Sequence, residues 1–337
     1  MEYEIKQLDI DSKEEINGLY NCLRECFKMN YEYFEWKHLF ESSNYLDRFT
    51  YCIFYQRKCI ATLQIIVSEL YIYNQLYHLG LAVDGATDAE HRGRGLYKKL
   101  LEYAMREMSS KNIDFILAFG NQISRKPLIN DYQFFDFARM ISGTYQVRYN
   151  KVFLAPVNLL IKLSFQLITL LKKHSYYTVS EISKSVYLEF LRLNIYQFDI
   201  YFGKKSDQID WRLSKPHSHY KFFGASNNHN HLTGVALVNI LNDKIYIEDI
   251  LSEKHQIKAL GYLICHIKSI AFSDVNIKKI NFSSNYSEVL MKIFKGNGFK
   301  INNSAENVLI KKLTGDYREV ILNGNAEMHF TRIDKNE

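Results

Sequence analysis

The chain has 337 residues, of which 47% are hydrophobic and 24% charged, a composition typical of a soluble globular protein with about two domains. Its formal net charge of +6 includes no block of five or more like charges, which excludes a basic tail that would bind nucleic acid. The five cysteines form no C-x-x-C pair and show no metal-ligand spacing, so we expect reduced thiols and no metal. The polar N-terminus, MEYEIKQLDIDSKEE, is unlike a signal peptide, and we expect a cytoplasmic protein.

The first half of the chain predicts a helix, a strand meander, a turn, a second helix and a strand. Residues 14–40 have the apolar spacing of a helix. The apolar runs at 49–87 are broken by QRK and YNQ, as in a meander of strands. An Arg- and Gly-rich turn at 88–95 leads into a predicted amphipathic helix at 96–112. The short apolar run at 113–119 predicts a strand covered on both faces.

The segment 152–171 is apolar enough to resemble a membrane span. Its polar residues Asn158, Lys162 and Gln166 recur every four positions, which predicts one polar stripe along a helix. We therefore expect no transmembrane segment and a helix packed on the core of the protein. A helix lying on a membrane surface is the alternative.

The second half repeats the order of the first. Three apolar segments at 220–251 precede a helical stretch at 255–272, a strand-like run at 278–284 and a helix with a turn at 286–299. The two tryptophans of the chain, Trp36 and Trp211, are each followed by a basic residue and each precede a meander. We expect an α/β (α+β) protein with two mixed-sheet domains and flanking helices. The expected boundaries are 1–148 for the first domain, 149–205 for a helical connecting region and 206–337 for a degenerate copy.

The turn before residue 96 has the properties of an anion site. Exposed N–H groups and the positive end of the dipole at a helix start suit a pyrophosphate. Gly93 and Gly95 allow the backbone to approach phosphates closely. Arg92 and Arg94 add positive charge. Because a strand precedes this turn and a helix follows it, we interpret it as a phosphate-binding loop.

The segment RGRGLYKKLL, preceded by VDGAT, resembles motif A of the GNAT superfamily of acyl-CoA N-acyltransferases. Arg92 and Gly95 match the motif, whereas Tyr97 stands where the motif has Gly or Ala, and its larger side chain is expected to crowd the turn. The resemblance implies acetyl-CoA as co-substrate and a GNAT-like fold for both domains. The cofactor-binding residues that it implies are Ala86, Thr87, Arg92, Gly93, Arg94, Gly95, Leu96, Tyr97 and Asn121.

Within that set, the resemblance implies different tasks for different residues. Backbone N–H groups near Ala86 and Thr87 would hold the pantetheine arm and polarise the thioester carbonyl. Asn121, after the next strand, stands where many relatives have an Asn on the pantetheine arm.

The sequence offers candidate residues for the catalytic base and acid. Without a bulge, alternation along the strand would put His78 and Asp84 on one face. Asp84 is the first candidate for the base, with a structural hydrogen bond to the loop as the equal alternative, and His78 is the second candidate. Ile129 stands where relatives often have a Tyr that acts as the general acid. Tyr132 could take over this role or be a packing residue.

The second half lacks the phosphate loop. The segment EDILSEKHQIKALGY contains neither a glycine pair nor an arginine. We therefore expect no coenzyme A binding there. Asp249, at the end of the central strand of this half, is expected to be a strand-end carboxylate.

The resulting hypothesis is an N-acetyltransferase that acts on a small amine. An amino sugar on a nucleotide carrier is the first choice of acceptor, because tandem chains with a W-[KR] signal before each meander resemble transferases of bacterial surface-polysaccharide pathways. The alternatives are a non-catalytic coenzyme A-binding or interaction module and an O-acyltransferase or a transferase of longer acyl chains.

Overall fold

The computed structural model describes residues 2–39, 48–120, 124–148, 160, 163, 176–204, 206–285, 287–313 and 326–331. Its contacts divide the chain into two compact units that each draw on both halves of the sequence. Unit 1 consists of Met1–Phe137, Ile200–Pro216 and Asn307–Ala326. Unit 2 consists of Ala138–Asp199, His217–Glu306 and Glu327–Glu337. The expected boundaries at 148 and 206 stay a prediction about the repeat. None of the helices within the described ranges is long and apolar enough to span a membrane.

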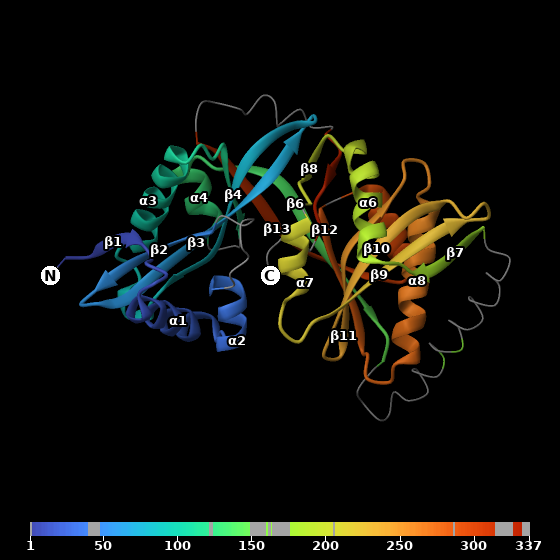
Figure 1. Ribbon diagram of the computed structural model, residues 1–337, viewed down its shortest axis with the longest axis horizontal. Helices are drawn as coiled ribbons and strands as arrows, with labels where there is room; N and C mark the ends of the chain where they lie inside the picture. Colours follow the sequence, from blue (N-terminus) through green and yellow to red (C-terminus); the bar gives the residue numbers. More distant parts are fainter. Residues whose placement is uncertain are drawn as a thin grey trace. The chain divides into compact units, whose positions relative to one another are not determined.

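Unit 1 is built on a mixed sheet whose strands follow the chain order and end with a strand from far along the sequence (Figure 1). Neighbouring strands are antiparallel except for the parallel pair β4–β5. The short strand β8 pairs with the end of β3. The strands are β1 (Glu4–Gln7), β2 (Arg48–Tyr55), β3 (Lys58–Ile72), β4 (Gln75–Thr87), β5 (Phe115–Gly120), β8 (Ile200–Phe202) and the part of β13 (Lys300–Lys312) from residue 307 onward.

Alternation along the strands of unit 1 gives the sheet two apolar faces. In β2, Tyr51 and Ile53 belong to the core under helices α3 (Leu96–Ser110) and α4 (Arg125–Tyr132). Cys52 and Phe54 belong to the core under helix α1 (Lys13–Phe27). Both faces of the central strands are therefore covered, which explains their unbroken apolar runs.

The helix expected at 14–40 is interrupted. Helix α1 begins at Ser12, whose side chain accepts the N–H of Glu15, and ends at Lys28 in the left-handed conformation. A short helix α2 (Tyr31–Phe34) and a π-helical turn η1 (Glu35–Leu39) follow. The break reorients the chain before the first meander.

Unit 2 repeats this plan. Strands β9, β10 and β11 form an antiparallel meander, β11 pairs in parallel with β12, and β12 pairs with β6. Helices α8 (Lys258–Ser273) and α9 (Glu288–Gly296) contribute to its main core, and α6 (Lys184–Asn194) contacts β9 and β10. The strands are β6 (Phe135–Gln146), β7 (Tyr177–Glu181), β9 (His219–Asn227), β10 (Leu232–Leu241), β11 (Lys244–Ser252), β12 (Lys279–Asn285) and β14 (Met328–His329).

Each unit is completed by a strand from the other half of the sequence. Residues 307–312 of β13 pair with β5 in unit 1, and residues 140–146 of β6 pair with β12 in unit 2. The predicted α/β architecture with mixed sheets is confirmed.

The connecting region expected to be helical is helical only in part. Residues 177–181 and 200–202 are strands, whereas 184–194 form α6. The helix expected at 152–171 lies outside the described residues, apart from positions 160 and 163.

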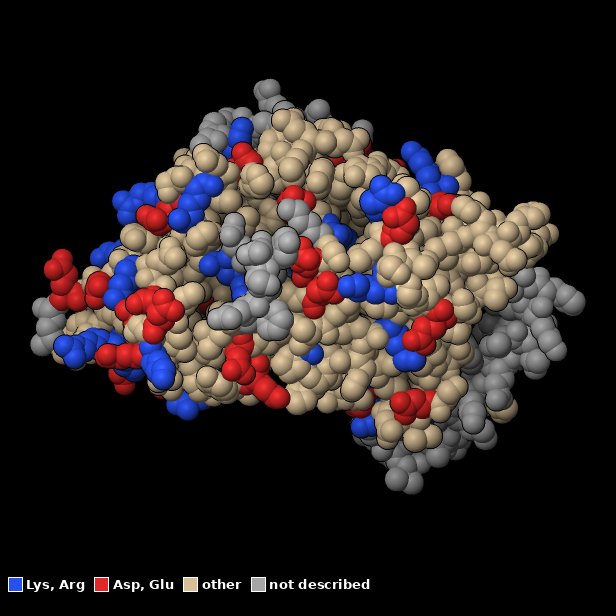
Figure 2. Space-filling view, viewed as in Figure 1, with Lys and Arg blue, Asp and Glu red and all other residues tan. Residues whose placement is uncertain are grey.

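Charges of both signs are interspersed over each unit on the face shown in Figure 2. That distribution agrees with the modest net charge of +6. A uniform basic field, which nucleic-acid binding would require, is not seen on the described part of that face.

Candidate acyl-CoA site

The loop that joins β4 to α3 has the backbone of an anion site. Gly93 and Gly95 take φ values of +76° and +70°, the left-handed region in which a side chain would be strained. A Cβ atom at either glycine would meet nothing within 4 Å, so the space above the turn is open. Gly95 caps α3 without a side-chain hydrogen bond, and the first turn of α3 has no acidic residue. This helix start can therefore receive a negatively charged ligand.

The two arginines of the loop support its shape and carry its charge. Arg92 Nε donates to the carbonyl of Thr87 at 3.0 Å. Arg94 donates to the carbonyl of Glu90 at 3.1 Å and to the hydroxyl of Tyr3 at 3.0 Å. Both arginines are exposed. Their charge is thus displayed to solvent beside the uncapped end of α3, as the sequence motif predicts.

Tyr97 lies over the end of β4. A Cβ atom at Gly85 would be 2.7 Å from Cε2 of Tyr97, so the ring is packed directly on this glycine. Burial raises the pKa of the Tyr97 hydroxyl. The large residue at the final motif position is accommodated by the missing side chain at position 85.

A β-bulge at the end of β4 determines where Asp84 points. Thr62 pairs with Ala86 but Gln64 pairs with Val83, so β4 has one extra residue here. Asp84 adopts φ +50° within this bulge. The expectation that His78 and Asp84 lie on one face of β4 requires side chains to alternate without interruption between the two faces. The bulge interrupts this alternation.

Asp84 is only partly exposed, with 13% of its side chain accessible, and is held by two basic side chains from η1. Lys37 Nζ lies 2.9 Å from Oδ1 of Asp84, and His38 Nε2 lies 3.1 Å from Oδ2. Burial alone would raise the pKa of Asp84, but the Lys37 charge and the hydrogen bond from His38 outweigh it and lower this pKa to about 2. Asp84 is therefore a permanent anion at neutral pH.

His38 is neutral, and both of its ring nitrogens form hydrogen bonds. Burial lowers the pKa of its imidazole despite the neighbouring Asp84. Its Nδ1 lies 3.1 Å from the side-chain nitrogen of Gln64, which can only donate. Nδ1 must accept this bond, so Nε2 carries the hydrogen that His38 donates to Asp84.

A pair of tryptophans fixes the turn that supplies Lys37 and His38. Trp36 stacks on Trp211 of helix α7 (Ser206–Leu213), with ring centroids 4.9 Å apart. Each indole N–H donates to the backbone carbonyl of the other tryptophan, at 2.9 and 3.1 Å. The sequence marked both tryptophans as equivalent signals, but it did not indicate that they contact each other. Trp36 and its neighbours Lys37 and His38 are buried functional candidates that the sequence analysis missed.

The remaining predicted residues lie in different places. His78 is exposed on β4 six residues before Asp84, roughly 20 Å away along an extended strand. Tyr132 is buried in the core between α3 and α4, and burial strongly raises the pKa of its hydroxyl. That hydroxyl has no hydrogen-bond partner in the described part of the chain. Asn121 lies outside the described residues.

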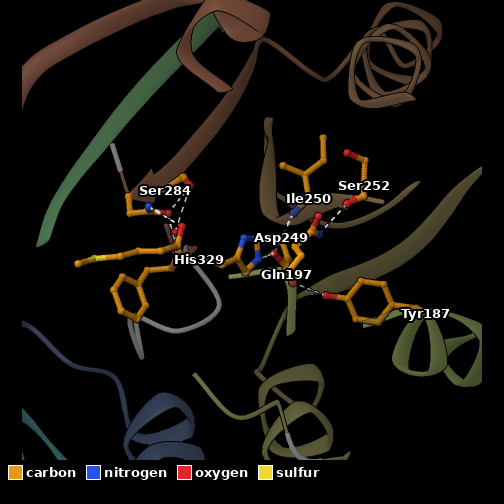
Figure 3. A network of polar contacts seen from close by, with 10 residues as sticks. Tyr187, Gln197, Asp249, Ile250, Ser252, Ser284 and His329 are labelled. Atoms are coloured by element: carbon orange, nitrogen blue, oxygen red, sulfur yellow. Dashed lines mark hydrogen bonds and ion pairs between the residues drawn. The ribbon is translucent and has the colours of Figure 1, made fainter. Parts of the chain in front are cut away.

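Unit 2 has its own buried aspartate at a bulged strand end (Figure 3). The extra residue of β11 is Glu248, next to Asp249. Asp249 Oδ2 accepts a hydrogen bond from the hydroxyl of Tyr187 at 2.7 Å, and Oδ1 lies 3.0 Å from His329 Nε2. The expected strand-end carboxylate is thus the centre of a buried network. Among the described residues, no cluster of three His, Cys, Asp or Glu side chains could hold a metal ion.

Residues 9–126, which contain the loop and Asp84, match the family model of the acetyltransferase (GNAT) domain. No protein of curated function matches the chain in sequence.

Solved structures share the fold of almost the whole chain. An N-acetyltransferase from Anabaena variabilis superposes with a TM-score of 0.66 at 12% identity, over 93% of this chain and 73% of that chain. A tandem GNAT protein from the clavulanic acid biosynthesis pathway gives 0.62 at 8% identity, over 94% and 100%. The N-myristoyltransferase of Saccharomyces cerevisiae with bound myristoyl-CoA gives 0.62 at 10% identity, over 91% and 78%. Residues 9–126 therefore correspond to a GNAT acetyltransferase domain, and the chain as a whole has the fold of these solved acyltransferase structures.

Proposed function

We propose that this chain transfers an acetyl group from acetyl-CoA to the amine of a small acceptor. One observation carries the proposal: α3 begins without a capping side chain behind two left-handed glycines, and two exposed arginines flank it. This arrangement lies within the residues that match the GNAT domain.

The loop residues would hold the phosphates of acetyl-CoA. The N–H groups at the start of α3 and the charges of Arg92 and Arg94 suit a pyrophosphate. The backbone of Ala86 and Thr87 would hold the pantetheine arm and polarise the thioester carbonyl. Bound acetyl-CoA supplies an activated acyl group; the chain has to orient it and exclude water. The open space above Gly93 and Gly95 supports this assignment.

We assign Asp84 to positioning the bulge rather than to removing the amine proton. A base should have a pKa near the working pH, and the pKa of Asp84 is held at about 2. Two basic partners and a left-handed backbone support a bracing role. By fixing the bulge, Asp84 would orient the backbone of Ala86 and Thr87. His78 is too distant along β4 to serve this loop directly, and the core position of Tyr132 supports packing.

The first acceptor that we propose is an amino sugar carried on a nucleotide. This choice rests on the resemblance of the two W-[KR] signals to tandem transferases of surface polysaccharides. A cytoplasmic location would fit such an acceptor and the five free cysteines.

Release of free thiol from acetyl-CoA tests the proposal. The panel should contain amino sugars, their nucleotide-linked forms, aminoglycosides, peptides and matched hydroxyl compounds. We expect thiol release with one class of amine and none with its hydroxyl counterpart. A Gly95→Val variant should lose acetyl-CoA binding, because a β-branched residue is strained at φ +70°.

Three other outcomes would contradict the proposal in different ways. Acetyl-CoA binding without acceptor-dependent thiol release would indicate a binding module. Release with hydroxyl compounds alone would indicate an O-acyltransferase. Turnover only with longer acyl-CoA donors would exclude the acetyl group as substrate.

A further inference from the structure

In unit 2, strands β11 and β12 separate at one end, and a C-terminal segment lies between them. The parallel pairing extends over Lys244–Ile247 on β11 and Lys279–Phe282 on β12. Beyond it, β11 continues to Ser252 and β12 to Asn285. Residues 328–331 contact both strand ends. Figure 3 shows His329 between Ser284 of β12 and Asp249 of β11.

The β12 side binds the main chain of this segment. The backbone N–H of Asn285 donates to the carbonyl of Phe330 at 2.8 Å, and its side-chain oxygen accepts the N–H of Phe330 at 3.0 Å. Its side-chain nitrogen donates to the carbonyl of Met328 at 2.9 Å. The hydroxyl of Ser284 gives the Phe330 carbonyl a second donor at 3.1 Å. These contacts recognise an extended peptide backbone of any sequence.

The β11 side binds one particular side chain. Asp249 is completely buried, and His329 Nε2 lies 3.0 Å from its Oδ1. The N–H of Ile250 and the hydroxyl of Tyr187 also donate to this carboxylate, at 2.9 and 2.7 Å. A buried carboxylate is costly without such donors, so the site favours a peptide with an imidazole at this position. The ring of Phe198 stacks on the imidazole at 4.9 Å.

The start of the segment is bound by Asp199. The N–H of Asp199 donates to the carbonyl of Glu327 at 2.8 Å, and the N–H of Glu327 donates to Oδ2 of Asp199 at 2.9 Å. Strand β14 is two residues long. Side chains of β11 and β12 thus bind individual positions of the segment, as in a ligand site. A backbone bridge between Ser284 and Thr331 adds to these contacts.

We propose that the ends of β11 and β12 form a binding site for an extended peptide that carries a histidine, and that residues 327–331 occupy it in cis. Asn285 binds the backbone and Asp249 binds the imidazole. A tethered segment competes at a high effective concentration, so a free peptide binds only when the segment is weakened. The site is independent of acyl transfer.

A change in the occupant tests the proposal while leaving the site intact. The His329→Ala variant of the full chain retains Asp249, Asn285 and Ser284. The probe is a labelled peptide AEMHFTR, which copies residues 326–332. We expect it to bind this variant at least tenfold more tightly than it binds the unmodified protein. The peptide AEMAFTR should bind neither.

Hydrogen exchange at the Phe330 amide reports whether the segment has left. We expect the exchange of this amide to accelerate at least tenfold in His329→Ala. His231→Ala is the matched control, because it removes an exposed histidine–carboxylate pair with Glu253 in the same unit. It should change neither exchange nor peptide binding. Asn285→Ala, a change in the site itself, should release the segment without gaining peptide affinity.

Two results would overturn the proposal. If exchange shows that the segment has left and His329→Ala still binds no peptide, or binds both peptides equally, the strand ends are no histidine-peptide site. If the Phe330 amide stays protected, His329 does not anchor the segment. Titration with acetyl-CoA should be unchanged in every variant, which separates failure here from failure of the proposed function.

Discussion

The two units place an aspartate at corresponding points, the bulged ends of β4 and β11, and surround it differently. Asp84 is paired with Lys37 and His38, which precede the meander of its own unit by a short stretch of sequence. Asp249 is held by Tyr187 and His329, which are distant in sequence on both sides. In our proposals, Asp84 fixes the bulge that leads to the glycine loop, and Asp249 binds the segment 327–331. A repeated fold can thus preserve a position and change its task through the partners.

The largest expected effect is a loss of stability when Asp249 is replaced. Its side chain is fully buried and accepts three hydrogen bonds. Asp249→Ala leaves Tyr187 and His329 without their partner, and we expect a loss of about 3–5 kcal/mol in the free energy of unfolding. Urea denaturation measures it. Asp243→Ala, at an exposed pair with Lys278, should have no measurable effect. Equal effects in the two variants would contradict a buried network.

Arg92 tests the feature that unit 1 has and unit 2 lacks. Arg92→Ala should weaken acetyl-CoA binding by about 1.5–3 kcal/mol, the range for hydrogen bonds to a charged group. Calorimetric titration gives this value. Arg106→Ala, farther along α3, is the matched control and should bind acetyl-CoA normally. Unchanged affinity in Arg92→Ala would remove the assignment of the phosphate loop.

The ionic character of the Asp84 cluster predicts a pH dependence. Because the folded pKa of about 2 lies below the ordinary value of 3.8, Asp84 stabilises the fold above pH 4 and loses this contribution as the pH falls toward 2. The contribution at neutral pH is roughly 2 kcal/mol, a group with 13% exposed side chain being only weakly screened. In Asp84→Asn, the free energy of unfolding at neutral pH should be lower by this amount. It should also depend less on pH between 4 and 2, as denaturation at a series of pH values would show.

The same variant distinguishes the two roles of Asp84. If Asp84 braces the bulge, turnover and acetyl-CoA affinity should decrease together. A loss of about 10²–10⁴ in turnover at constant affinity would instead identify Asp84 as the base. Thiol release and calorimetry on one preparation separate these cases.

The smallest expected effect is at the start of α8 in unit 2. Lys258→Ala removes the positive charge at the first residue of α8. We expect no change in acetyl-CoA affinity and one site per chain in the titration, because residues 248–262 lack both arginine and the glycine pair. Two equivalent sites would show that the second unit also binds the nucleotide.

Local patterns were sufficient to predict much of the fold and the loop. Apolar runs with turn signals predicted the strands of both meanders, and the R-G-R-G segment predicted the left-handed turn before α3. These features depend on neighbouring residues, so a single sequence contains them.

Contacts between distant residues could not be predicted in this way. His38 meets Asp84 across 46 positions, and His329 meets Asp249 across 80. The bulge that turns Asp84 depends on a one-residue shift against β3, which periodicity does not reveal. The two tryptophans were the available signal for the first cluster, because they mark the turn that supplies Lys37 and His38.

The completion of each sheet by a strand from the other half constrains the order of events on the ribosome. Phe115 pairs with Leu79 of β4 early, but its neighbour in β13, Lys312, is made roughly 200 residues later, so this long-range pairing comes late in synthesis. Until residues 307–312 of β13 are made, the first unit has an unpaired edge at β5. A stop codon near residue 300 would remove part of both units at once, so the two halves of the gene do not encode two separate folding units.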